Sequence, residues 1–188
     1  MLHHLPNIIS IFRAILVLPI AFLLLESSWG RASILILVAG VSDGIDGYLA
    51  RRFQWQSQLG AILDPLADKL LIVIIFIIMA YMGIIPIWLA GLVLGRDLII
   101  LSGALAYRWL TKDIDISPLF ISKVNTALQI IFVLALLYHL SIASLPVTLL
   151  KAGEYVVATV VIASGVSYVI CWTGYYKKYL KLQKNGDA

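Results

Sequence analysis

The feature that most constrains this chain is a series of long apolar segments, each close to the length that crosses a lipid bilayer. A hydrocarbon core of about 30 Å requires about 20 consecutive, mostly apolar residues in a helix. Lipid offers no hydrogen-bond partners to a backbone, so such segments are expected to be helical. The composition agrees, since 62% of the 188 residues are hydrophobic and 13% are charged. We therefore predict an all-α, polytopic integral membrane protein with a single domain over residues 1–188.

An N-terminal amphipathic segment leads directly into the first of six predicted transmembrane helices. The predicted helices occupy residues 5–26, 32–52, 59–83, 87–110, 119–140 and 155–176. The basic residues on one side of this topology are Arg51, Arg52, Arg108, Lys112, Lys177, Lys178, Lys181 and Lys184. Arg31 and Lys151 fall on the other side. Because cytoplasmic loops carry an excess of Lys and Arg, both termini and the connection over residues 53–58 are expected in the cytoplasm.

Four aspartates interrupt the apolar pattern at the cytoplasmic ends of the second and third predicted helices. Asp43 and Asp46 are three residues apart, and Asp64 and Asp68 are four apart. Residues at these spacings share one face of a helix. The short connection should make the two helices antiparallel neighbours, so we expect the four carboxylates to converge. Carboxylates repel one another strongly where the dielectric constant is low, so a cation is expected among them.

Carboxylate oxygens are ligands for hard divalent cations, which indicates Mg²⁺ or Mn²⁺. Four carboxylates are enough to hold a pair of such ions. Paired metals are a recurrent solution for displacement at phosphorus, because they hold phosphate oxygens and offset the charge on the leaving group. Gly47 and Gly60 lie beside the carboxylates, where the lack of a side chain lets a bulky ligand approach. Close packing between membrane helices explains these glycines equally well.

The acidic stretch follows the pattern D-x2-D-G-x2-A-R-x8-G-x3-D-x3-D from Asp43 to Asp68 without a mismatch. This pattern resembles the signature of the CDP-alcohol phosphatidyltransferase family. The resemblance implies six membrane helices, a homodimer, and an active site facing the cytoplasm of a bacterium or the mitochondrial matrix. It also implies a reaction in which an alcohol hydroxyl attacks the lipid-linked phosphorus of a CDP-alcohol and CMP leaves.

The resemblance further implies roles for individual residues. It makes Asp68 the general base and a further metal ligand beside Asp43, Asp46 and Asp64. It places Gly47, Ala50, Arg51 and Gly60 around the nucleotide. Two polar residues near the start of the first helix are further candidates for the nucleotide site, with helix capping or solvation as the alternative. These residues are Asn7 and Ser10.

Two cations and one amide are candidates for binding the acceptor alcohol. Arg96 lies inside the fourth predicted helix and Lys123 at the start of the fifth, and buried cations in membrane helices are commonly functional. The alternatives are an ion pair of Arg96 with Asp97 or a cluster aspartate, and snorkelling of Lys123 to the interface. Asn125 occupies the position where phosphatidylglycerophosphate synthases typically carry a second lysine. Together with the stretch FISKVNT, this resembles the CMP-forming cardiolipin synthase branch of the family.

The expected function is therefore transfer of a phosphatidyl group from CDP-diacylglycerol to phosphatidylglycerol, giving cardiolipin and CMP. The alternative acceptor is glycerol 3-phosphate, a dianion that suits a site with one more cation. A cation transporter is a remote alternative, since it predicts acidic residues spread along a path through the membrane. An intramembrane aspartyl protease would need two acids and would leave the glycines unexplained. The net charge of +4 fits cytoplasmic basic flanks, and no nucleic acid partner is expected.

Overall fold

The computed structural model describes the backbone of residues 5–53, 60–111 and 120–184, and the side chains within 15–42, 69–103 and 121–174. The described chain is all-helical and contains no strand, which confirms the all-α part of the predicted fold class. Its helices are α1 (Leu5–Leu25), α2 (Trp29–Phe53), α3 (Gly60–Tyr81), α4 (Ile87–Thr111), α5 (Phe120–Ser141) and α6 (Val147–Lys184). Each predicted helix therefore has a counterpart in the structure.

The largest differences from the predicted boundaries are at the two ends of α6, which runs from Val147 to Lys184 rather than over residues 155–176. The carbonyl of Pro146 accepts hydrogen bonds from the backbone N–H groups of Leu149 and Leu150, at 2.9 and 3.3 Å. Proline suits the first turn of a helix, where its missing N–H is not needed. The predicted N-terminal amphipathic segment is likewise continuous with the first span, since both lie within α1.

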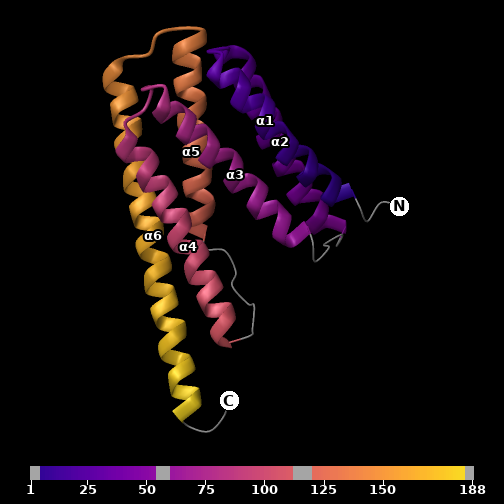
Figure 1. The fold of residues 1–188 in the computed structure, drawn as a ribbon, viewed down its shortest axis with the longest axis vertical. Helices are drawn as coiled ribbons and strands as arrows, with labels where there is room; N and C mark the ends of the chain where they lie inside the picture. The colour runs from indigo at the N-terminus through magenta and orange to yellow at the C-terminus, as the bar shows by residue number, and fades with distance from the viewer. Residues whose placement is uncertain (1–4, 54–59, 112–119, 185–188) are drawn as a thin grey trace.

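The helices form two groups that are joined side by side (Figure 1). In one group α1 packs against both α2 and α3, and in the other α6 packs against both α4 and α5. Contacts of α2 with α5 and of α3 with α4 join the two groups. The chain runs back and forth, so the C-terminal ends of α2 and α4 lie at the same end of the bundle as the starts of α3 and α5 (Figure 1). The acidic stretch of the sequence belongs to this end.

The turn between α3 and α4 lies at the opposite end and depends on a glycine. Gly83 has a φ of 72°, in the left-handed region that side chains disfavour. The Gly83 N–H donates to the carbonyl of Ala80 at 3.1 Å, which closes the end of α3.

Apolar side chains fill the interior of the bundle and also cover much of its outside. Phe76, Leu89 and Leu137 are fully buried, whereas Leu18 and Ile34 are 74% and 62% exposed. Within the described residues, two segments are long and apolar enough to cross a membrane, Ile121–Ser141 and Val147–Gly174. An outer surface of this kind, together with these two helices, is consistent with a membrane protein.

Candidate functional site

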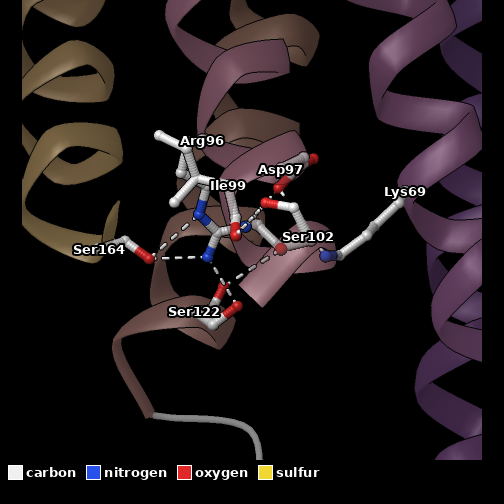
Figure 2. A network of polar contacts seen from close by, with 8 residues as sticks. Lys69, Arg96, Asp97, Ile99, Ser102, Ser122 and Ser164 are labelled. Atoms are coloured by element: carbon white, nitrogen blue, oxygen red, sulfur yellow. Dashed lines mark hydrogen bonds and ion pairs between the residues drawn. The ribbon is translucent and has the colours of Figure 1, made fainter. Parts of the chain in front are cut away.

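A buried arginine connects the three helices of one group, α4, α5 and α6. Arg96 is on α4, and only 5% of its surface is exposed. Its Nε and Nη2 atoms donate to Ser164 Oγ on α6, at 3.2 and 2.7 Å. Nη2 also donates to Ser122 Oγ on α5, at 2.8 Å, and Nη1 donates to Asp97. Figure 2 shows these contacts converging on the guanidinium from α4, α5 and α6.

The position of each partner follows from helical spacing. Ser164 and Tyr168 are four residues apart on α6 and so share one face. The Tyr168 ring lies 5.7 Å from the guanidinium carbon, within the range of a cation–π contact. Burying a charged group among apolar side chains is costly unless hydrogen bonds and an opposite charge compensate for it. The two serines, the ring and the carboxylate provide that compensation for Arg96.

The polar network continues from α4 to α3 through a carboxylate. Asp97 Oδ1 lies 4.0 Å from the Nζ atom of Lys69, which directly follows Asp68 in the chain. A small cavity of about 20 Å³ adjoins this ion pair and is also lined by Thr126 and Gln129 of α5. A space of this size holds about one water molecule. The network therefore reaches the part of α3 where the acidic stretch ends.

The structure distinguishes among the three residues proposed to bind the acceptor. Arg96 is paired with Asp97, as one of the two alternatives from the sequence predicts. Asn125 on α5 is 1% exposed, and its Oδ1 atom has no hydrogen-bond partner in the described part of the chain. Lys123 is exposed, so its side chain lies outside this buried network. Acceptor binding by these residues stays a prediction.

Three residues of this network were not predicted from the sequence, namely Ser122, Ser164 and Tyr168. Serines are common in membrane helices, where many donate only to their own helix. Ser167 does so, since its hydroxyl donates to the carbonyl of Ala163 at 2.8 Å. Only the packing of α6 against α4 distinguishes Ser164 from Ser167.

The acidic residues can be placed along the bundle by the helices that carry them. Asp43 and Asp46 are on α2, and Asp64 and Asp68 are on α3. Their side chains lie outside the described residues. The same applies to the side chains of the predicted nucleotide site, Asn7, Ser10, Gly47, Ala50, Arg51 and Gly60. The predicted convergence of the carboxylates is therefore not tested.

The packing of α2 against α5 shows which part of α5 lies level with the acidic stretch of α2. Gly40 of α2 and Gln129 of α5 line one small apolar cavity. The two helices run in opposite directions (Figure 1), so one turn forward on α2 and one turn back on α5 brings residue 44 level with Asn125. The contact of Lys69 with Asp97 places the acidic end of α3 beside Arg96. The acidic ends of both helices therefore lie level with Arg96 and the first turns of α5.

A divalent metal site fits the residue types at this level. The donor set is four carboxylates, and such oxygen ligands suit Mg²⁺ or Mn²⁺ rather than softer metals. Among the residues whose side chains the structure describes, no three His, Cys, Asp or Glu gather to hold a metal. The four aspartates are outside that set.

Comparisons with known proteins agree with the pattern in the sequence. A family model described as CDP-alcohol phosphatidyltransferase matches residues 3–172. A protein named cardiolipin synthase (CMP-forming) from Rattus norvegicus is 36% identical over 146 residues, which are 69% of this chain and 48% of that protein. A fusion protein from Schizosaccharomyces pombe, named cardiolipin synthase (CMP-forming) / mitochondrial hydrolase, is 35% identical over 88% of this chain and 30% of its own length.

A relative whose name gives a different activity is matched over a larger share of both chains than the rat and fission yeast proteins are. The chloroplastic CDP-diacylglycerol--glycerol-3-phosphate 3-phosphatidyltransferase 1 of Oryza sativa subsp. japonica is 34% identical over 89% of this chain and 56% of that protein. The chain thus spans about half the length of the curated relatives from rat and rice.

Proposed function

The chain belongs to the CDP-alcohol phosphatidyltransferase family, and we propose that it makes cardiolipin and CMP from CDP-diacylglycerol and phosphatidylglycerol. The observation that carries this proposal is the full set of acidic motif residues on α2 and α3, level with a buried polar network around Arg96. The proposal includes six membrane spans, acidic helix ends on the cytoplasmic side, and a homodimer. The cardiolipin synthases from rat and fission yeast support the choice of product.

The aspartates have separate tasks in this proposal. Asp43, Asp46, Asp64 and Asp68 would hold two Mg²⁺ or Mn²⁺ ions. When bound, the ions would hold the pyrophosphate oxygens and offset the negative charge on the departing CMP. Asp68 accepts the proton of the attacking hydroxyl, because an alcohol is a poor nucleophile until it loses that proton. Gly47, Ala50, Arg51, Gly60, Asn7 and Ser10 surround the nucleotide.

The charges at the acceptor side favour phosphatidylglycerol over glycerol 3-phosphate. Phosphatidylglycerol is a monoanionic diester, whereas glycerol 3-phosphate is a dianionic monoester. Within the described chain, the Arg96 charge is already paired with Asp97, and Lys123 is exposed. Asn125 contributes no charge where a second lysine would add one. Few cations among the described side chains are therefore available for a second negative charge. The rice relative keeps glycerol 3-phosphate as the second candidate acceptor.

The Asp68→Asn variant tests the assignment of the general base. This change keeps the side-chain volume and removes the proton acceptor, so CMP release should fall by about 100-fold or more. Binding of CDP-diacylglycerol should stay near the wild-type value, whereas Asp43→Asn should weaken both binding and CMP release. Parallel loss of binding and turnover in Asp68→Asn would assign Asp68 to the metals alone.

Removal of divalent metal tests the cofactor. Chelation should stop CMP release, and added Mg²⁺ or Mn²⁺ should restore it. Full turnover in a chelated sample, with residual metal measured directly, would rule out the metal-dependent reaction.

The Asn125→Lys variant tests the charge argument for the acceptor. An added cation should raise the use of glycerol 3-phosphate relative to phosphatidylglycerol, measured as the ratio of kcat/KM values. An unchanged ratio would remove this argument.

A further inference from the structure

A buried oxygen with no partner marks a place where a ligand is expected. Asn125 is 1% exposed, and in the described part of the chain its Oδ1 atom accepts no hydrogen bond. A buried acceptor without a donor destabilises the folded state, because it loses its bonds to water and gains none. Such groups are rare in native proteins, and a specific use commonly explains them.

Asn125 lies at the same level of the bundle as the acidic end of α2, where the proposed reaction centre belongs. Asn125 lies on the inward face of α5, between Ser122 and Gln129. Ser122 is held by Arg96 Nη2 at 2.8 Å, so the start of α5 is fixed relative to α4. The antiparallel packing of α2 and α5 brings Asn125 level with residue 44, between Asp43 and Asp46 in the sequence.

The chemistry of the unpaired atom specifies its partner. A carbonyl oxygen of an amide only accepts hydrogen bonds, so the missing group must be a donor. The glycerol headgroup of phosphatidylglycerol offers two free hydroxyls. The primary hydroxyl attacks phosphorus in the proposed reaction, which leaves the secondary hydroxyl free to donate.

From these observations we infer that Asn125 Oδ1 accepts a hydrogen bond from the secondary hydroxyl of the acceptor's glycerol headgroup. This inference rests on the proposed function and names a specificity-determining residue within it. Asn125 selects alcohols that carry a second free hydroxyl beside the one that attacks. A site built to bond a hydroxyl rejects an analogue that lacks it, because the polar atom of the protein is then left unpaired.

The test compares two acceptors in the full chain, purified in detergent with CDP-diacylglycerol as donor. One acceptor is phosphatidylglycerol, and the other is the phosphatidyl ester of 1,3-propanediol. The second keeps the attacking primary hydroxyl and lacks the secondary one. Wild-type protein should prefer phosphatidylglycerol by about 10-fold to 100-fold in kcat/KM. A preference below about 2-fold, which is less than one hydrogen bond contributes, would overturn the inference without any variant.

The Asn125→Leu variant then assigns the preference to this residue. Leucine has a similar volume and removes the unpaired oxygen, so the variant should fold and melt near the wild-type temperature. Its kcat/KM for phosphatidylglycerol should fall to the value for the propanediol ester, and the value for that ester should not change. The matched control is Gln129→Leu, one turn further along α5 and also buried, which should keep the wild-type preference.

The outcomes separate this inference from the function on which it rests. Equal loss with both acceptors in Asn125→Leu would overturn the hydroxyl contact and leave the phosphatidyl transfer intact. Loss of preference in Gln129→Leu as well would also overturn it, since the effect would not belong to Asn125. No turnover of either lipid acceptor by wild-type protein would overturn the proposed function together with this inference.

Discussion

Replacing Ser164 by alanine should loosen the bundle at Arg96. Ser164 Oγ is fully buried and accepts two hydrogen bonds from the guanidinium, at 3.2 and 2.7 Å. Alanine differs only by the hydroxyl, so the variant removes both bonds and creates little empty space. Two N–H groups of a buried cation then lack an acceptor.

The expected magnitude follows from those two bonds. Hydrogen bonds between membrane helices average about 0.6 kcal/mol, and bonds to charged groups are worth about 1.5 kcal/mol or more. Two such bonds give a loss of about 1–3 kcal/mol in the free energy of unfolding. Reversible unfolding in mixed micelles of increasing sodium dodecyl sulfate, followed by circular dichroism, measures this free energy.

Ser167 provides the matched control on the same helix. Its hydroxyl donates to the Ala163 carbonyl within α6, at 2.8 Å. Ser167→Ala should therefore change the free energy of unfolding by less than about 0.5 kcal/mol. Equal effects of Ser164→Ala and Ser167→Ala would refute the view that Arg96 joins α4 to α6 through Ser164.

Four further variants test other contacts of the bundle. Gly153→Ala should cost about 1–3 kcal/mol, because a Cβ there would lie 2.9 Å from the Phe132 ring. At Gly91 no atom lies within 4 Å of an added Cβ, so Gly91→Ala should stabilise the protein by up to about 1 kcal/mol. Equal changes in melting temperature for the two glycine variants would contradict the close contact of Gly153 with Phe132. Asp97→Asn should cost about 3 kcal/mol by leaving the buried Arg96 without its carboxylate, and adding Lys69→Met should recover part of it by removing the half-buried second cation. Absence of any recovery in that double variant would show that the Lys69–Asp97 contact is unimportant for stability.

The helices could be predicted because the bilayer imposes their length and leaves the backbone few alternatives. The start of α6 was predicted wrongly because Lys151 and Glu154 were interpreted as part of a connection. Both lie on the helix, near its first turns, where polar residues can stay in contact with water or lipid headgroups. Polarity marks the depth of a residue in a membrane more reliably than it marks the end of a helix.

The polar network could be predicted only in part. The ion pair of Arg96 with Asp97 was one of two alternatives, since the residues are adjacent in the sequence. The contacts with Ser122 and Ser164 depend on how α4, α5 and α6 pack, and apolar residues on every face of a membrane helix conceal which face is inward. For the same reason the sequence left open whether Lys123 snorkels to the surface, as its exposure now indicates, and it did not predict that Asn125 is buried.

The most direct test of the central claim is a competition between the two acceptors. Purified protein receives CDP-diacylglycerol, a divalent metal, and equal concentrations of phosphatidylglycerol and glycerol 3-phosphate, and mass spectrometry identifies the lipid products. The proposed function predicts that cardiolipin accumulates in step with CMP and that phosphatidylglycerophosphate stays at background. Phosphatidylglycerophosphate as the main product, with no cardiolipin, would contradict it.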